Sequence, residues 1–244
     1  MEHFQDGAIK LNERSLPSRY NIETYIMLDN SLTGKMRELK LDTMDYTATL
    51  ISQANLLLRK LEPPATIVVT GIQKSFKTIE TYSKRTHDNR LQAEATAKLL
   101  FDYISANPRM KQSDLIVLMT WLHMVGYTSD GKHINIDGHT ILGGACSRKK
   151  VVILREEPGQ YSGVQATAHE VAHSLGASHD GIGSSSECAE NKNFLMYPYE
   201  FPPTTKVFSR CTKDAVARFL RMDLATCLFT DTSKHIPMHT RTKN

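Results

Sequence analysis

The sequence lacks any apolar run long enough to cross a bilayer, and it has no recognisable export signal near its start. Its longest apolar stretch, Leu115 to Val125, contains Thr120 and His123 and covers only about half of a membrane-spanning helix. The first twenty residues are charged and contain no apolar core followed by small residues. We therefore expect no membrane span, and we expect any export signal to lie upstream of this sequence.

Glycine, proline and one-sided charge are also scarce. The 244 residues include 13 glycines and 9 prolines, too few for a low-complexity or largely disordered chain. The net charge of +4 is too small to indicate nucleic acid as the main partner. With 40% hydrophobic and 23% charged residues, the composition is that of an ordinary globular protein, and the length suffices for one sizeable domain.

Cysteine is absent from the first part of the chain, and the four cysteines all lie in its last hundred residues, at Cys146, Cys188, Cys211 and Cys227. An even count confined to one region favours two disulfides and an oxidising compartment. Four reduced, buried thiols in an intracellular protein would explain the same count. The cysteines alone leave both interpretations open, and they permit three disulfide connectivities.

Strand and helix patterns alternate through the first two-thirds of the chain. Apolar residues at helical spacing predict three helices, over 43–61, 91–105 and 213–224. Short apolar runs predict four strands, over 21–29, 66–70, 114–119 and 151–154. The glycine-punctuated stretch 126–144 predicts turns and an edge strand. The alternation indicates an α/β fold, followed by a last third with few strand signals.

The segment Ala168–Gly181, AHEVAHSLGASHDG, carries the clearest chemistry. His169 and His173 are four residues apart, so on a helix both imidazoles project from one face and can bind one zinc ion. Gly176 can leave right-handed helical space and turn the chain back, which lets His179 approach the same ion. Three protein ligands leave the fourth position open for water, as in catalytic zinc sites.

Glu170 lies beside the first of these ligands and can reach a metal-bound water without being a ligand itself. A bare H-E-x-x-H also occurs by chance, as two solvated histidines on a polar helix face. Here the neighbouring residues Val164, Val171 and Leu175 are apolar, so the helix is predicted to be buried. Burying unpaired histidines without a metal is costly. The full pattern H-E-x-x-H-x-x-G-x-x-H is the metzincin signature.

On these residues the chain resembles the metzincin zinc endopeptidases, and more narrowly the reprolysin (adamalysin) family of snake-venom metalloproteases and ADAM catalytic domains. Asp180, directly after the third histidine, is the residue type that distinguishes reprolysins. Three further segments resemble the Met-turn, the G-G-x-C-S segment and the F-S-x-C segment of the family: 194–198, 142–147 and 208–211. The resemblance covers about residues 20–230 and is strongest over 142–220.

The resemblance implies a metzincin-like domain over 20–230. Its upper subdomain, about 20–176, would hold a mixed twisted sheet, long helices and the active-site helix. Its smaller, irregular lower subdomain, 177–230, would hold the Met-turn and a C-terminal helix. Residues 1–19 would be a lead-in and 231–244 a flexible tail. Met196 would lie beneath the zinc ligands without binding metal, although alone it would be interpreted as a core residue.

The resemblance also implies two disulfides, Cys146–Cys227 and Cys188–Cys211, and a possible calcium ion. Glu23 and Asp114 match two calcium ligands of the family. The third is normally an asparagine, whereas this chain has Thr230 at that position. Glu23 and Asp114 are therefore interpreted either as calcium ligands or as solvated acids at strand edges.

The function that this resemblance implies is a secreted, monomeric zinc endopeptidase similar to arthropod venom or salivary members. Zinc would activate water with Glu170 as general base and acid, and a protein or peptide substrate would bind extended. The expected edge strand for substrate comprises Ile141, Leu142, Gly143, Gly144 and Ala145, with an ordinary turn as the alternative.

Two other functions compete with this one. One is a catalytically weak zinc-binding toxin or adhesion module, against which the intact Glu170 argues. The other is an intracellular protein with incidental histidines. The remaining histidines have no mutual ligand spacing and are predicted to be at the surface or locally bonded: His3, His87, His123, His133, His139, His235 and His239.

Overall fold

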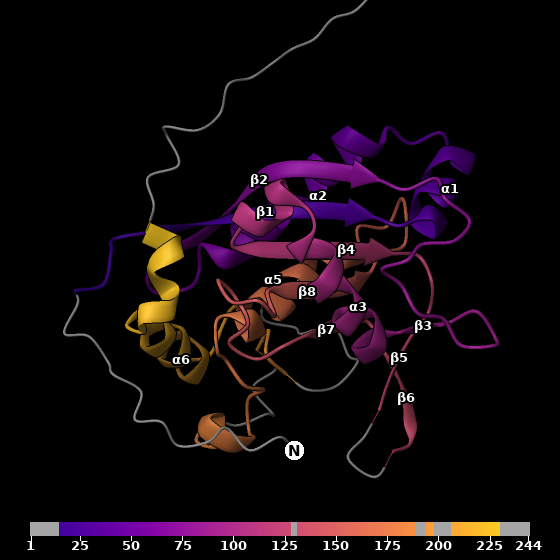
Figure 1. Cartoon of the computed structure of the whole chain (residues 1–244). Coiled ribbons are helices and arrows are strands. Elements are labelled where there is room, and N and C mark those ends of the chain that lie inside the picture. Colours follow the sequence, from indigo (N-terminus) through magenta and orange to yellow (C-terminus); the bar gives the residue numbers. More distant parts are fainter. Residues whose placement is uncertain (1–14, 128–130, 189–193, 198–205, 230–244) are drawn as a thin grey trace, which may run out of the picture.

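A five-stranded sheet forms the centre of the computed structural model, which describes residues 15–127, 131–188, 194–197 and 206–229 (Figure 1). The sheet order is β2-β1-β4-β8-β7. Neighbouring strands are parallel except β7, which pairs antiparallel with β8 at the edge. The strands are β1 (Tyr20–Leu28), β2 (Ala65–Lys74), β4 (Leu115–Thr120), β7 (Gly138–Thr140) and β8 (Val151–Arg155).

Helices alternate with these strands along the chain, and three short strands form a second, smaller sheet. The α-helices are α1 (Asn30–Glu38), α2 (Thr43–Leu58), α3 (Ala93–Ser105), α4 (Pro108–Gln112), α5 (Gly163–Ser174) and α6 (Arg210–Leu220). The 3-10 helices η1 and η3 span Gly183–Ser185 and Asp223–Phe229. The second sheet has the order β3-β5-β6, with β3 (Leu91–Gln92), β5 (Met124–Tyr127) and β6 (His133–Ile136).

Alternate residues of the central strands face two separate cores. On one face Ile26, Val117 and Val152 pack in a core shared with α2, α5 and α6. On the other face Met27 and Leu118 pack in a core shared with α3. Every residue of β4, LIVLMT, is buried, as expected for a central parallel strand covered on both sides. The result is a mixed α/β fold of three layers, with α5 held between β8 and α2, which confirms the predicted fold class.

Most elements lie where the sequence pattern predicts them. Helix α1 was not expected, because it has no continuous apolar stripe; it begins where the Asp29 carboxylate accepts a hydrogen bond from the Leu32 N–H. The C-terminal helix starts at Arg210, three residues before the predicted start, because Ser209 caps it by accepting from the Thr212 N–H. Among the described residues no helix is both long and apolar enough to cross a membrane.

The stretch 126–144 contains an edge strand, as predicted, but the substrate edge expected over 141–145 lies too far along the chain. The edge strand is β7, and 141–145 form a turn that follows it. Gly143 has φ +67°, a left-handed conformation incompatible with a strand. The N–H groups of Gly143 and Ala145 donate to the carbonyls of His173 and Ser174, over 2.9 and 3.0 Å. The turn therefore caps the end of α5, a tertiary role that the glycine pattern alone does not specify.

Candidate active site

The start of α5 is fixed by a buried carboxylate. Glu156 is fully buried after β8, and its Oε2 accepts a 2.5 Å hydrogen bond from the Gly163 N–H. Its Oε1 accepts a 2.5 Å hydrogen bond from the Tyr46 hydroxyl of α2. That hydroxyl in turn accepts from the N–H groups of Gly159 and Tyr161, each over 3.0 Å. Glu156 and Tyr46 thus link α2 and the preceding loop to the N-terminus of the helix that carries the zinc motif.

The end of α5 turns the chain back towards the helix. Gly176 has φ +88°, and its N–H donates to the His173 carbonyl over 2.9 Å. The Ala177 N–H donates to the Ala172 carbonyl over 3.0 Å, which completes a Schellman motif. The left-handed conformation favours glycine at position 176. Within three further residues the chain reaches His179, whose imidazole approaches the two histidines of the helix.

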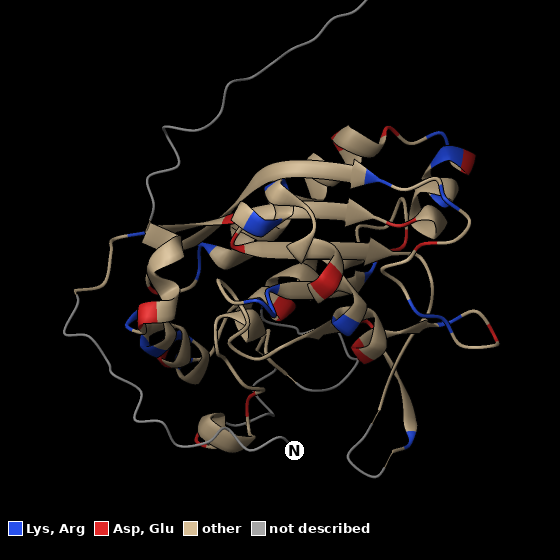
Figure 2. Cartoon of the chain, viewed as in Figure 1, with Lys and Arg blue, Asp and Glu red and all other residues tan. Residues whose placement is uncertain are grey.

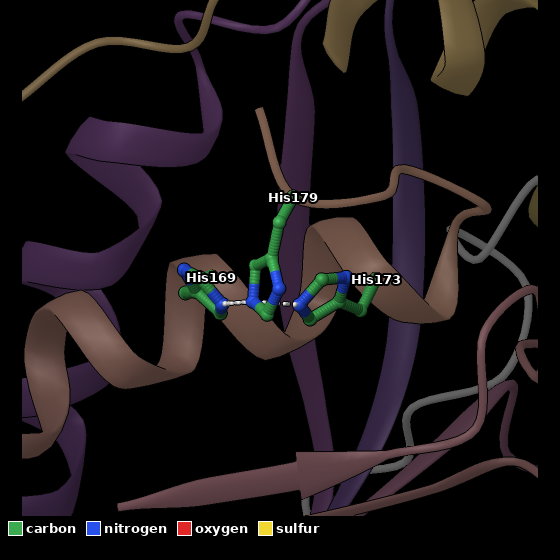
Figure 3. Close-up of side chains that lie close together, drawn as sticks. All are labelled: His169, His173 and His179. Atoms are coloured by element: carbon green, nitrogen blue, oxygen red, sulfur yellow. Dashed lines mark hydrogen bonds between the residues drawn. The ribbon is translucent and has the colours of Figure 1, made fainter. Parts of the chain in front are cut away.

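The three predicted zinc ligands converge on one point (Figure 3). The Nε2 atom of His179 lies 3.1 Å from Nε2 of His169 and 3.0 Å from Nε2 of His173. Three nitrogens bound tetrahedrally to one zinc at about 2.05 Å would lie about 3.3 Å apart. The observed separations fit such an ion closely. Among the described residues, these three histidines are a group able to hold a metal.

Backbone carbonyls set the tautomer of both helical histidines. Nδ1 of His169 is 2.6 Å from the Leu195 carbonyl oxygen, and Nδ1 of His173 is 2.6 Å from that of Ala177. Because a carbonyl oxygen can only accept, each Nδ1 carries the proton and donates it. Each Nε2 then offers its lone pair to the common point. Such contacts orient metal-bound histidines and raise their basicity.

Burial keeps the three imidazoles neutral at physiological pH. It lowers the pKa of His169 to about 4 and the pKa of His173 well below its ordinary value. Burial also lowers the pKa of His179. Since a metal binds the neutral ring, these shifts favour the ligand form over the protonated form.

Glu170, the residue after His169, lies in a tight and almost fully buried position. Its side chain is 7% exposed, and burial raises its pKa to about 8. The carboxylate packs so closely on Gly138 of β7 that a Cβ at this position would overlap it. Glycine at 138 therefore leaves space for the carboxylate of Glu170 next to the edge strand.

Met196 lies in the segment predicted to be a Met-turn, and Asp180 directly follows His179. The Tyr197 N–H donates to the Phe194 carbonyl over 3.0 Å, which closes a turn in which Met196 is fully buried. The Met196 carbonyl accepts from the Asp180 N–H over 2.9 Å. The Asp180 carboxylate accepts a 2.5 Å hydrogen bond from the hydroxyl of Ser209. The third ligand is thereby tied both to this turn and to the start of α6.

The structure contains the two disulfides expected from the resemblance, Cys146–Cys227 and Cys188–Cys211. Glu23 and Asp114 also lie together, because the Asp114 carboxylate accepts from the Glu23 N–H over 2.8 Å. The sulfur atoms nearest Asp114 belong to the Cys146–Cys227 disulfide and are not oxygen ligands of the kind that calcium prefers. The described residues thus do not by themselves complete a calcium site, and Thr230 lies outside the described residues.

His139 differs from the expectation of a surface or locally bonded side chain. It lies on β7 next to Gly138 and is half-buried, and its buried Nε2 has no hydrogen-bond partner in the described part of the chain. Burial lowers its pKa. The stretch 126–144 predicts an edge strand without giving its limits, so the sequence does not show which way the His139 side chain faces.

Comparison with known proteins agrees with this geometry. The family model "Reprolysin (M12B) family zinc metalloprotease" matches residues 19–231. "Venom metalloproteinase BumaMPs1" of Olivierus martensii is 25% identical over 82% of this chain and 52% of its own length. "Venom metalloproteinase 3" of Eulophus pennicornis is 26% identical over 83% of this chain and 50% of its own length.

The chain therefore spans about half the length of these curated relatives. A solved chain titled "Structure of a chaperone-substrate complex" superposes with a TM-score of 0.51, at 11% identity, over 85% of this chain and 40% of that one. At that identity the likeness concerns the fold alone. The match of the family model over most of the chain shows that this protein belongs to the reprolysin family of zinc metalloproteases.

Proposed function

We propose that the chain is the catalytic domain of a secreted zinc endopeptidase. One observation carries the proposal. The Nε2 atoms of His169, His173 and His179 meet at one point, while the Nδ1 atoms of the two helical histidines are bound to carbonyls. Glu170, one residue after the first ligand, supplies a carboxylate on the same helix. The three histidines would hold the ion and leave one position for water and substrate.

Zinc bound at this point supplies a Lewis acid and lowers the pKa of water towards 7. The proposed role of the protein side chains is to transfer the proton of the attacking water. The Glu170 carboxylate accepts the proton as water attacks the carbonyl carbon of the scissile peptide, and its acid form then donates that proton to the departing amine nitrogen. Burial raises the pKa of this carboxyl group in the metal-free protein, so the position favours the acid form that the second step requires.

The substrate proposal rests on the free edge of β7. This strand is the last in the sheet and leads directly from Gly138, beside Glu170, into the turn that caps α5. An extended peptide could add a further strand along β7. The N–H groups of Gly143 and Ala145 are already bonded to α5, so the pairing edge comprises Gly138–Thr140 and not the turn. A bulky apolar residue after the cleaved bond is the family-based expectation for specificity.

Secretion is proposed from the disulfides and from the relatives. Both cysteine pairs are oxidised, which fits an extracellular compartment. Two relatives are named as venom metalloproteinases, and a venom or salivary role is proposed here by similarity to them. We propose a monomer as the working unit.

The decisive experiment combines metal analysis with cleavage of a quenched peptide. We expect one zinc per chain, cleavage that a chelator abolishes, and restoration of cleavage by added zinc. The Glu170→Gln variant should retain the metal and lose about 10²- to 10⁴-fold in kcat. Absence of bound or reconstituted zinc would contradict the proposal. Zinc binding without any cleavage would instead favour the toxin or adhesion module that acts by binding.

Calcium at Glu23 and Asp114 remains a separate proposal based on the family resemblance. Its test is thermal unfolding of the zinc-loaded protein with and without added calcium. A rise in Tm that Asp114→Asn abolishes would support a calcium site. An unchanged Tm would leave Glu23 and Asp114 as partners of each other only.

A further inference from the structure

The loop after β2 exposes two apolar side chains to an unusual degree. Phe76 is 62% exposed and Ile79 is 81% exposed, the highest values among the exposed large hydrophobic residues of the described chain. Single exposed apolar residues are common on protein surfaces. Here two of them lie within one short segment, KSFKTI, in which Lys74 and Lys77 are exposed as well.

This exposure does not result from a loosely held loop. At its start the Ser75 N–H donates to the Leu28 carbonyl over 2.9 Å. At its end Glu80 is buried, and its Oε1 accepts from the Asn30 N–H over 2.8 Å and from the Tyr82 hydroxyl over 2.6 Å. Arg85 binds the other carboxylate oxygen over 3.2 Å. The loop is therefore anchored on both sides of its exposed tip.

Trp121 belongs to the same end of the sheet. It follows β4 and is 39% exposed, and its backbone N–H donates to the Ser31 hydroxyl over 3.2 Å. The ammonium group of Lys35 lies 5.1 Å from the centre of its ring. Since Glu80 binds the Asn30 N–H and Trp121 binds Ser31, both loops meet at the start of α1. We name the set around this point the sheet-end surface: the half-buried Lys35 and the exposed Lys74, Phe76, Lys77, Ile79 and Trp121.

The charge at this end of the sheet is positive. Figure 2 shows Lys and Arg on α1, at the end of β2 and along the loop that follows it. Most of the acidic groups among them are buried or paired, whereas Asp42 is exposed and lies near enough to Lys74 to interact with its charge. Asp29 is buried and caps α1, Glu80 is buried and paired with Arg85, and Glu38 is paired with Lys35 over 2.7 Å. Lys74 and Lys77 are exposed and form no ion pair among the described residues, so they can attract an anionic partner.

We propose that the sheet-end surface docks the protein on an anionic lipid bilayer, with Phe76 and Ile79 entering the headgroup region. Apolar side chains, lysines and a tryptophan on one rigid surface match the chemistry of the membrane interface. A sulfated polysaccharide would complement the lysines but would give no role to Phe76 and Ile79. Docking here is independent of the zinc centre, and it would hold the protease near substrates attached to membranes.

The test is sedimentation of the full chain with vesicles. We expect binding to phosphatidylcholine vesicles that contain about 30 mol% phosphatidylserine, and at least tenfold weaker binding to phosphatidylcholine alone. Phe76→Ser with Ile79→Ser should weaken binding by at least about tenfold. Lys74→Gln with Lys77→Gln should weaken it by about fivefold for each lysine.

Matched controls lie elsewhere on the surface. Leu224→Ser removes an apolar side chain that is 42% exposed on η3, and Lys98→Gln with Lys149→Gln removes two exposed lysines. These variants should bind vesicles like the unchanged protein. All variants should cleave a soluble peptide at the unchanged rate, which shows that they are folded.

Two results would overturn docking on lipid. The first is no binding of the folded, active protein to anionic vesicles. The second is binding that Phe76→Ser with Ile79→Ser leaves unchanged, because contact would then be electrostatic alone. Binding to heparin but not to vesicles falls under the first result and would identify a polysaccharide as the partner.

Discussion

At the scale of single residues, the burial of Glu170 conflicts with the negative charge of its ionised carboxylate. It is buried beside Gly138, and burial raises its pKa from an ordinary 4.5 to about 8. In the metal-free protein the folded state therefore holds a proton that the unfolded state releases above pH 4.5. The unfolded state binds fewer protons in this range, so the contribution of Glu170 to stability falls as pH rises from about 4.5 to about 8.

This conflict predicts a pH-dependent gain in stability for Glu170→Gln without metal. At pH 5 the variant and the unchanged protein should have similar free energies of unfolding. By pH 8 the variant should be more stable by up to about 4 kcal/mol, since each pKa unit corresponds to about 1.4 kcal/mol. Denaturant unfolding of both proteins at several pH values measures the difference. A difference that does not grow with pH would show that Glu170 is ionised in the fold.

Gly138 is a second residue whose identity the site requires. A Cβ at this position would overlap the Glu170 carboxylate, so Gly138→Ala should displace that carboxylate. We expect about 10²-fold lower kcat/KM with little loss of zinc. Gly34→Ala is the matched control, because no atom lies within 4 Å of its added Cβ on α1. The control should keep full activity and gain about 0.5–1 kcal/mol in stability. Equal activity of both variants would contradict the close packing at Gly138.

At the scale of elements, the Glu156–Tyr46 contact determines how α5 is held. Glu156→Ala would leave the Gly163 N–H and the Tyr46 hydroxyl without their buried partner. We expect it to lower the free energy of unfolding by about 3 kcal/mol, and Tyr46→Phe by about 2 kcal/mol. Both should also release zinc faster, because α5 carries two of the ligands. Chemical denaturation and zinc transfer to a chromogenic chelator measure the two effects.

Tyr127→Phe is the control for this contact. Tyr127 is 44% exposed at the end of β5, so loss of its hydroxyl should change stability by less than about 0.5 kcal/mol. If Tyr46→Phe cost no more than this control, the hydroxyl of Tyr46 would not be needed to hold α5.

The elements also show which features a sequence reveals. The helical spacing of Tyr46, Leu50 and Leu58 predicted α2, and the spacing of two histidines predicted the metal-bearing face of α5. Helix α1 escaped prediction because its start depends on one cap at Asp29. The limits of β7 escaped because Gly143 serves a tertiary contact with α5 that is invisible in the local pattern.

Some parts of the site depend on contacts between distant segments. No local pattern could indicate that Glu156 would meet Tyr46, since 110 positions separate them. The carbonyl that fixes the His169 tautomer belongs to Leu195, 26 positions further on. The convergence of the three histidines was predictable because zinc chemistry constrains their spacing, whereas the contacts that support them depend on how the sheet and helices pack.

At the scale of the whole molecule, the two disulfides connect the C-terminal part to the rest. Cys146–Cys227 closes a separation of 81 positions and Cys188–Cys211 a separation of 23. In the chain-entropy model these loops stabilise the fold by about 4.5 and about 3.4 kcal/mol. Replacing each pair with alanine should lower Tm, with the larger loss for Cys146 and Cys227. Thiol titration of the unfolded, unreduced protein should find no free thiols, and four free thiols would contradict the proposal of secretion.

The turn after β7 joins the strand proposed to bind the peptide to the helix proposed to bind the metal. Its N–H groups hold the last carbonyls of α5, so the strand and the helix bearing His169 and His173 cannot slide past one another. The backbone register of a peptide paired with β7 would consequently place each of its peptide bonds at a fixed distance from the metal site. Under the proposed function, pairing of the peptide backbone with β7 then determines which bonds can reach the ion, and the side chain after the cleaved bond selects among them.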